Sequence, residues 1–265
     1  MANLVDLKIF NPYKVNGLKR VGNSNDGGYV IHTPSLEHVD CLINYGVGYN
    51  VEFEKQFNKL TGVPVYAFDP TMKKAKYFIE GFKRGEYVNT LKLMVKLMLW
   101  LPKEKELKNY KIDFVEEGLA DKNTEEFKTY DYHLTKYKLR DKKVFLKIDI
   151  EGAEYDTLKD ENFYKNFDNV VQLVIEFHYL GTRLSELAEI MNKISRTHSL
   201  IHIHGNNIGG TFSYNSKSVP EVIEAVFLHN SFIPEKELST ESYPINGLDL
   251  PCNSKWKDIP LDFFK

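Results

Sequence analysis

The chain has 265 residues, of which 42% are hydrophobic and 27% are charged, so it can bury a sizeable core. Its 35 Lys and Arg residues against 37 Asp and Glu residues give a net charge of −2, which argues against a nucleic-acid-binding protein because phosphate binding needs a net basic surface. The longest apolar run, residues 91–101, is interrupted by lysines and is far shorter than the roughly 20 residues that a bilayer span requires.

The N-terminus and the cysteine content are typical of a cytoplasmic protein. Residues 1–10 lack the basic-then-apolar pattern of a secretory signal. Only two cysteines, Cys41 and Cys252, are present, which argues against a disulfide framework. No repeat, low-complexity tract or linker divides the chain, so we expect a single domain over residues 1–265, with an N-terminal extension at 1–40 and an insertion at about 84–110.

Short apolar runs alternate with segments of helical period along the chain. In chain order, the predicted strands are residues 41–45, 63–68, 112–115, 143–150, 170–177, 200–203 and 222–228. The predicted helical segments lie around Phe53, Phe57 and Leu60, from Pro70 to Phe82, over residues 153–165, and along the apolar stripe 184–194. This alternation predicts an α/β fold with right-handed crossovers and a mainly parallel sheet that has helices on both faces.

The segment between the second and third predicted strands is longer than a normal connection. Residues 84–110 carry the apolar run and are expected to form an extra amphipathic helical segment packed on the core. A lid over the site and a dimer surface are the alternatives, so a homodimer stays open.

Two features after the first two strands point to an adenosine-containing ligand. Gly46 and Gly48 follow the first strand, and Asp69 ends the second strand 21 residues after Gly48. An acidic side chain there can accept hydrogen bonds from both hydroxyls of a ribose. A dinucleotide fingerprint would need a third glycine where the chain has Val51, so NAD is disfavoured and S-adenosylmethionine is the leading candidate. For Asp69, a helix N-cap ahead of Pro70 is the structural alternative.

Polar side chains stand at the carboxyl ends of three later strands, where ligands bind in parallel sheets. They are Asp149 at the fourth strand, Glu176 and His178 at the fifth, and His204, Asn206 and Asn207 at the sixth. If these strands are neighbours, the polar groups converge on one pocket. A divalent metal held by Asp149, Glu176 and His204 is open but not favoured, since a set of acids and histidines suits a transition metal better than Mg²⁺ or Ca²⁺. His202 is expected to point away from His204 and to be structural.

One stretch of the sequence resembles the signature of a known protein family. Residues 146–158, Leu-Lys-Ile-Asp-Ile-Glu-Gly-Ala-Glu-Tyr-Asp-Thr-Leu, resemble the signature of the FkbM-like family of S-adenosylmethionine-dependent methyltransferases. Further matches lie at residues 20–29, 45–48, 53–54, 202–207 and 258–262, and residues 20–29 look like an added Asp-Gly-Gly-Tyr element of one subgroup. The resemblance implies a Rossmann-like class I methyltransferase fold, with a seven-stranded sheet whose last strand is antiparallel. It also implies methyl transfer to an oxygen.

The resemblance further implies which residues hold the cofactor. The candidates are Asp26, Tyr29, Tyr45, Gly46, Gly48, Glu54, Asp69 and Leu119. Asn44 stands where many class I methyltransferases have an acidic residue, and Asn50 where a third glycine is usual, so we expect Asp26 or Glu54 to share in binding the methionine end. Tyr29 and Tyr45 could face the sulfonium through cation–π attraction, with core packing as the alternative.

Methyl transfer to a hydroxyl needs in-line positioning and a base for the hydroxyl proton. Asp149 and His204 are the leading candidates for the base and for orienting the acceptor, and Glu176 and His178 are expected to bind acceptor hydroxyls. Asn206 and Asn207 suit sugar recognition, while Glu151 either binds substrate or caps the next helix. The predicted function is O-methylation of a sugar, either nucleotide-activated or a surface polysaccharide (capsule) precursor. The alternatives are a non-sugar small-molecule acceptor and an inactive nucleotide-binding scaffold.

Overall fold

Seven strands form one central sheet in the computed structural model, which describes residues 4–71 and 107–265. Their order across the sheet is β5 (Ile112–Val115), β4 (Val65–Phe68), β3 (Cys41–Tyr45), β8 (Val144–Ile148), β9 (Val170–Phe177), β13 (Ile223–His229) and β10 (His198–Gly205). The first five run parallel, and β13 is antiparallel to both β9 and β10. This arrangement confirms the predicted class I methyltransferase fold.

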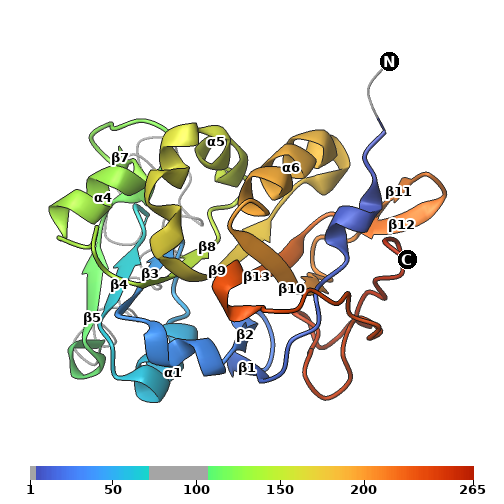
Figure 1. Ribbon diagram of the computed structural model, residues 1–265, viewed down its shortest axis with the longest axis horizontal. Coiled ribbons are helices and arrows are strands. Elements are labelled where there is room, and N and C mark those ends of the chain that lie inside the picture. Colours follow the sequence, from blue (N-terminus) through green and yellow to red (C-terminus); the bar gives the residue numbers. More distant parts are fainter. Residues whose placement is uncertain (1–3, 72–106) are drawn as a thin grey trace, which may run out of the picture.

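Helices cover both faces of the sheet, as expected (Figure 1). One face carries α4 (Tyr130–Lys136), α5 (Glu154–Lys159), η4 (Glu161–Asn169) and α6 (Leu180–Ile194). The other carries α1 (Glu52–Thr61), η2 (Pro34–His38) and a hairpin of β1 (Leu18–Gly22) and β2 (Gly28–His32). The predicted helix from Pro70 to Phe82 and most of the 84–110 insertion lie outside the described residues; of the insertion, the structure describes Leu107 and η3 (Lys108–Tyr110).

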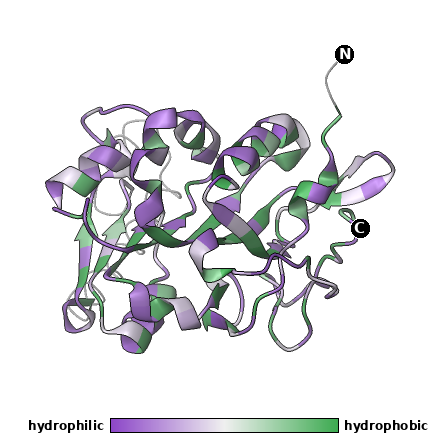
Figure 2. Cartoon of the chain, in the orientation of Figure 1, coloured by the Kyte–Doolittle hydropathy of each residue, from purple (hydrophilic) through white to green (hydrophobic). Residues whose placement is uncertain are grey.

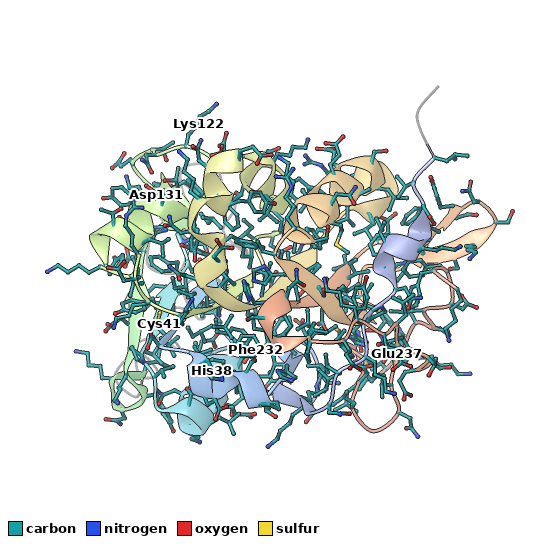
Figure 3. All side chains as sticks on the ribbon, in the orientation of Figure 1. His38, Cys41, Lys122, Asp131, Phe232 and Glu237 are labelled. Carbon is teal, nitrogen blue, oxygen red and sulfur yellow. The ribbon has the colours of Figure 1, made fainter. Side chains whose placement is uncertain are left out.

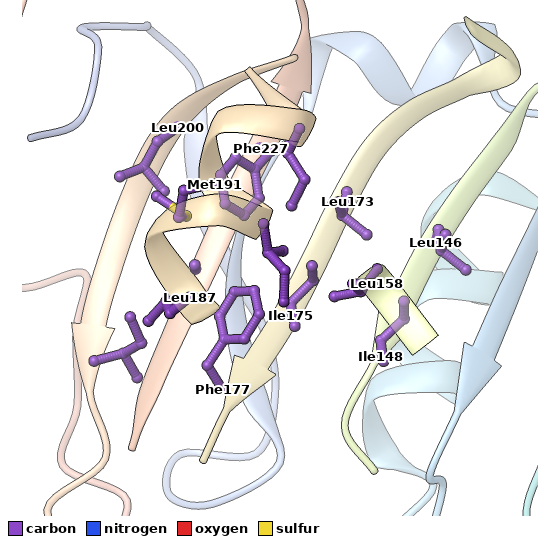
Figure 4. Close-up of a cluster of buried hydrophobic side chains, with 14 of the residues drawn as sticks. Leu146, Ile148, Leu158, Leu173, Ile175, Phe177, Leu187, Met191, Leu200 and Phe227 are labelled. Atoms are coloured by element: carbon purple, nitrogen blue, oxygen red, sulfur yellow. The ribbon is translucent and has the colours of Figure 1, made fainter. Parts of the chain in front are cut away.

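The alternating directions of strand side chains divide the core into two apolar layers. In β8, Leu146 and Ile148 join the layer under α5 and α6, whereas Phe145 joins the layer above α1. Figure 4 shows the first layer, where Leu158 and Leu187 from the helices lie close to the sheet. The strands are accordingly apolar along their length, while the helices alternate between apolar and polar residues (Figure 2). Burial of each such side chain contributes about 1.5–3 kcal/mol, and this fixes the register of the sheet.

Several predicted elements differ from the observed ones; β10, for example, extends over His198–Gly205, beyond the predicted residues 200–203. Strand β8 ends at Ile148 rather than residue 150, because Glu151 and Gly152 adopt positive φ values of 56° and 103°. The helix predicted over 153–165 breaks at Asp160, whose extended backbone ends α5 and whose side chain accepts a hydrogen bond from the Asn162 amide to begin η4. Leu60 is 49% exposed and does not share the buried face of α1.

The N-terminal extension is tied to the sheet through Gln172 of β9. The Gln172 side chain accepts a hydrogen bond from the His32 amide at 2.7 Å and donates one to the His32 carbonyl at 3.2 Å. Nearby, His38 packs on Phe232 of η5 (Asn230–Phe232), with ring centroids 5.2 Å apart (Figure 3). These contacts hold the β1–β2 hairpin beneath β9 and β13.

The remaining elements are short. They are η1 (Leu7–Phe10) and two further strand pairs, β6 (Gly118–Leu119) with β7 (Phe127–Lys128) and β11 (Thr211–Tyr214) with β12 (Lys217–Pro220). Residues 234–265 are without helices and run beside β10 and β13 (Figure 1). Among the helices of the described residues, none combines the length and apolar character needed to cross a membrane.

Candidate functional site

A cavity of about 730 Å³ opens at the carboxyl ends of β3, β4 and β8. Its size is that of a small-molecule site. Of the predicted site residues, those that line it are Asp26, Tyr29, Gly46, Gly48, Glu54, Asp69, Leu119, Asp149 and Glu151. The cavity therefore brings together nearly all the predicted cofactor residues and the leading candidate for the base.

The turn after β3 can be built only with glycine at its first position. Gly46 has a φ of 80°, and a Cβ on it would lie 1.5 Å from the backbone oxygen of Asp149. Gly48 also has a positive φ, of 58°, but a Cβ there would meet no atom of the described residues within 4 Å. The first glycine thus lets the loops after β3 and β8 touch, and the second leaves open space on the cavity side.

Asp69 joins this turn to the end of β4. One oxygen of its buried carboxylate accepts a hydrogen bond from the Gly48 amide at 2.8 Å. The other accepts from the amide and the hydroxyl of Thr71, at 2.8 and 2.6 Å. Asp69 thus organises the chain directly after β4, and its Oδ2, which accepts a single hydrogen bond, retains acceptor capacity for a ligand.

Tyr45 does not line the cavity. Its buried ring stacks on Phe68 with centroids 4.9 Å apart, and its hydroxyl contacts His133 Nδ1 at 3.0 Å. Tyr45 supports the cavity floor from behind, which matches the core-packing alternative for this residue.

Glu54 lines the cavity, and one of its two carboxylate oxygens is buried without a hydrogen-bond partner in the described residues. Its Oε1 accepts a hydrogen bond from the Asn44 side-chain amide, whereas its Oε2 has no hydrogen-bond partner within residues 4–71 and 107–265. Burial raises the pKa of Glu54 to about 7, although Lys147 opposes this. An unpaired buried acceptor is costly, so this oxygen fits a cationic or hydrogen-bond-donating ligand group.

Tyr29 connects two carboxyl groups across the ends of β8 and β9. Its hydroxyl lies 3.0 Å from Asp149 Oδ2 and 3.2 Å from Glu176 Oε2. Burial, together with the charges of Asp149 and Glu224, raises the pKa of Glu176 well above its ordinary value. A protonated Glu176 can therefore donate to Tyr29, which donates in turn to the Asp149 carboxylate.

Lys147 and His178 balance the charge around Asp149. The Lys147 ammonium lies 3.5 Å from Asp149 Oδ2 and 4.4 Å from the centroid of the Tyr29 ring. His178 Nδ1 contacts the fully buried Glu154 at 2.9 Å, while Nε2 lies 4.0 Å from Asp149 Oδ1. Burial opposes charging of His178, but the hydrogen bond and charge of Glu154, reinforced by the acids nearby, raise its pKa to about 9. The imidazole is therefore charged at neutral pH and stands directly behind the cavity wall.

The expectation that the fifth and sixth predicted strands are neighbours is wrong, because β13 lies between them. Glu224 of β13 pairs in register with Glu176 on one side and with His204 on the other. His204 is 1% exposed and does not line the cavity; its Nδ1 lies 3.1 Å from Glu224, and its Nε2 lies 3.0 Å from Asp258. Their hydrogen bonds outweigh burial and raise the pKa of His204.

Asn206 and Asn207 also lie outside the cavity lining. Asn206 donates a hydrogen bond to Glu176 Oε1 at 2.8 Å, so it joins the chain that ends at Asp149. Asn207 instead binds the backbone of Asn253 in the C-terminal segment, residues 234–265. The predicted convergence of all these polar groups on one pocket is therefore corrected: Asp149 lines the cavity, and the groups from β9 and β10 stand behind it or beside it.

The metal ligands considered from the sequence do not form one set. In the part of the chain that the structure describes, two groups have suitably close ligand atoms: Asp149, Glu151 and His178; and His204, Glu224 and Cys252. Neither unites Asp149, Glu176 and His204.

His202 was expected on the opposite face from His204, and this expectation is wrong. Residues two apart in a strand share a face. His202 Nε2 accordingly contacts Asp249 at 3.1 Å, on the same C-terminal segment that supplies Asp258 to His204.

Sequence reasoning missed four polar residues of this region. They are Lys147, Glu224, Asp249 and Asp258. Lys147 was within the quoted signature, where a lysine inside an apolar strand is an unusual residue. Glu154 of the same signature is expected, like Glu151, either to cap the next helix or to take part in catalysis, and it is found paired with His178. Glu224 is unusual in the same way as Lys147, because it is a charged residue inside the last apolar strand. Asp249 and Asp258 could not be inferred, because their partners, His202 and His204, are far away in the sequence.

The family model described as the methyltransferase FkbM domain matches residues 40–205. Among solved structures, the chain is similar to a putative rRNA-methylase from Clostridium thermocellum, at 11% identity over 74% of this chain and 92% of that chain, with a TM-score of 0.35. It is also similar to precorrin-6y C5,15-methyltransferase from Geobacter metallireducens GS-15, at 11% identity over 74% of this chain and 84% of that chain, with a TM-score of 0.36. A search of curated proteins finds no match. Since the family model covers more than half of the chain and spans the cavity-forming strands β3 to β9, the chain belongs to the FkbM methyltransferase family.

Proposed function

We propose that this methyltransferase uses S-adenosylmethionine and methylates a hydroxyl group of a sugar. The observation that carries the cofactor assignment is the unpartnered Glu54 oxygen, in the same cavity as Asp69 and Gly48. A carboxylate that lacks a partner suits the ammonium group of the methionine end, while Asp69 can accept from the ribose hydroxyls at the far side of the Gly48 turn. When bound, the cofactor supplies an electrophilic methyl group.

Asp149 is the proposed proton acceptor. Its carboxylate lines the cavity and is held in place by Tyr29 at 3.0 Å and Lys147 at 3.5 Å. An alcohol is a weak nucleophile, so the hydroxyl proton must pass to a positioned base as the new bond to oxygen forms. The charged His178 stands behind Asp149, with its Nε2 4.0 Å from Asp149 Oδ1, and acts as a positioning residue rather than as a base.

The acceptor side is rich in groups that bind hydroxyls. Asp149 and Glu151 line the cavity, and the Tyr29 hydroxyl and the Glu176 carboxyl extend the same polar wall. A polyhydroxylated acceptor uses such alternating donors and acceptors better than an apolar one does, which favours a sugar over other small molecules.

Two variants separate the proposed roles of cofactor binding and catalysis. Asp69→Ala should weaken S-adenosylmethionine binding, measured by calorimetry, by at least tenfold, while changing the rate at saturating cofactor much less. Asp149→Asn should bind the cofactor as the wild type does and lose transfer of labelled methyl groups by a factor of about 10²–10⁴. Wild-type affinity in Asp69→Ala would remove Asp69 from the ribose site, and a near wild-type rate in Asp149→Asn would remove Asp149 as the base.

A further inference from the structure

Buried polar side chains connect residues 249–258 of the C-terminal segment to β10 and to Asn207, which follows this strand. His202 binds Asp249, His204 binds Asp258, and Asn207 accepts from the Asn253 amide through its Oδ1 at 2.8 Å. All three β10-side residues are at most 7% exposed. Burying such polar groups is costly unless they are fully paired, and apolar residues could hold a tail in place at lower cost. The paired polar groups give this irregular segment one defined conformation.

The same segment borders the cavity through the N-terminal hairpin. The Asp26 amide donates a hydrogen bond to the Cys252 carbonyl at 3.1 Å, and Asp26 lines the cavity. The Asn25 side chain donates to the Pro251 carbonyl at 3.0 Å. On its other side, the segment binds Asn207, which donates a hydrogen bond to the Asn253 carbonyl at 3.0 Å. Residues 249–258 do not line the cavity themselves, but these hydrogen bonds join them to the hairpin turn that does, and they lie outside the part of the chain that the family model matches.

The turn over residues 253–257 exposes an aromatic residue that has a lysine on each side of it in the sequence. The Trp256 amide bonds to the Asn253 carbonyl at 3.1 Å, which closes a turn, and Asn207 Nδ2 lies 3.3 Å from both the Trp256 and the Lys257 carbonyls. The turn leaves Trp256 54% exposed, and Lys255 and Lys257 are exposed on either side of it. A fixed backbone beneath an exposed tryptophan is typical of a recognition surface, because a large ring can stack on a ligand without first being ordered.

Charge complementarity indicates what this surface binds. The cavity beside it is lined by five acidic residues, Asp26, Glu54, Asp69, Asp149 and Glu151, and by a single lysine, Lys147. An acceptor that carries a phosphate would be repelled there unless cations stand at the rim. Lys255 and Lys257 place two such cations next to a ring that can stack on a sugar or a base.

We propose that the turn Asn253–Lys257 binds the acceptor, and that the acceptor is a sugar carrying a phosphate or diphosphate group, as nucleotide-activated sugars do. The inference rests on the proposed function and specifies its substrate class. Trp256 stacks on the ligand, Lys255 and Lys257 bind its phosphate oxygens, and the hydroxyl to be methylated reaches Asp149. His204 acts through Asp258 as a positioning residue for this turn.

The test compares three forms of each sugar in a hexose panel: the free sugar, its 1-phosphate and its uridine diphosphate derivative. Wild-type protein should methylate the phosphorylated forms with a kcat/KM at least tenfold above that of the free sugar. The double variant Lys255→Gln/Lys257→Gln should reduce this preference to threefold or less, by raising KM with kcat retained. The matched control, Lys138→Gln/Lys142→Gln, changes two exposed lysines just before the amino end of β8, whereas the cavity lies at its carboxyl end, and should keep the wild-type preference.

The aromatic contact is tested separately with Trp256→Ala and Trp256→Phe. The alanine variant should raise KM for all three forms, and the phenylalanine variant should restore most of the loss. Equal methylation of free and phosphorylated sugars by the wild type, or an unchanged KM in the double lysine variant, would overturn the inference and leave the proposed function standing. Failure of the wild type to methylate any form, despite cofactor binding, would contradict both.

Discussion

At the residue scale, the most informative side chain is Tyr29, which the sequence had suggested as a partner for the cofactor. Tyr29 lines the cavity, and its hydroxyl lies between Asp149 and Glu176, while the Lys147 ammonium lies 4.4 Å from the centroid of its ring. The Asp-Gly-Gly-Tyr element thereby supplies a link between the carboxyl ends of two strands. The sequence alone indicates that Asp149 is an unusual residue. It could not predict that Tyr29 connects Asp149 with Glu176, because the packing of the hairpin on the sheet depends on residues that are far apart in the sequence.

Glu54 gives a pH-dependent prediction for cofactor binding. Burial raises its pKa to about 7, and the cationic end of the cofactor needs the ionised form. We expect S-adenosylmethionine affinity, measured by calorimetry, to rise severalfold between pH 6 and pH 8. Glu54→Gln should weaken binding and flatten this profile, whereas the control Glu52→Gln, on the same helix but outside the cavity lining, should change neither. A profile that stays equally steep in Glu54→Gln would contradict the assignment.

The same residue affects stability in the opposite direction. Between about pH 4.5 and pH 7 the folded protein holds the Glu54 proton more tightly than the unfolded chain does, so its contribution to the ligand-free protein falls as pH rises through this window. Urea unfolding of Glu54→Gln should show a smaller loss of stability across this pH range than the wild type shows. An identical loss in both proteins would exclude this role of Glu54.

At the element scale, the sequence predicted the strands well because buried strands of a parallel sheet are continuous apolar runs. It did not predict the order of the last two strands, and this misplaced His204, since periodicity carries no information about which strands are neighbours. The sequence also did not predict the break of the helix at Asp160. An Asp can cap a helix or lie within one, and the sequence pattern alone does not tell these two cases apart.

The turn after β3 provides a prediction with a matched control. Gly46→Ala combines a positive φ with a Cβ placed 1.5 Å from the Asp149 carbonyl, whereas Gly62→Ala has a similar φ of 72° and no atom of the described residues within 4 Å. We expect Gly46→Ala to cost about 3 kcal/mol or more and Gly62→Ala about 1 kcal/mol in urea unfolding. Equal losses would show that φ alone matters and that the loops after β3 and β8 are not in contact.

The contacts between residues 249–258 and β10 give a further prediction. Asp258→Asn removes the charged partner of His204 Nε2, so it should lower stability by about 1–3 kcal/mol and raise KM for the acceptor with little effect on cofactor affinity. Because the pKa of His204 is raised on folding, its contribution to stability is fully present below about pH 6.5 and falls as pH increases. Asp262→Asn, on the same segment but without a side-chain partner in the described residues, is the control. A parallel rise in cofactor Kd would indicate a general loss of structure instead.

At the scale of the whole molecule, the sequence predicted the fold class, the family and the region of the cavity. The α/β alternation is set by local periodicity, and the 146–158 signature places Lys147, Asp149 and Glu154 around one strand end. The sequence also predicted Asp26 and Tyr29 as site residues, and both line the cavity. It could not predict that Pro251 and Cys252, near the other end of the chain, hydrogen-bond to the same hairpin. The net charge of −2 also concealed a local excess of acid, since five acidic residues and one lysine line the cavity.

The most direct test is to incubate the wild-type protein with methyl-labelled S-adenosylmethionine and the panel of free and phosphorylated hexoses, and to follow the label into the acceptor. The account predicts stoichiometric cofactor binding and transfer of label to a sugar hydroxyl, with phosphorylated acceptors preferred. Cofactor binding without transfer to any acceptor of the panel, or absence of cofactor binding, would contradict it.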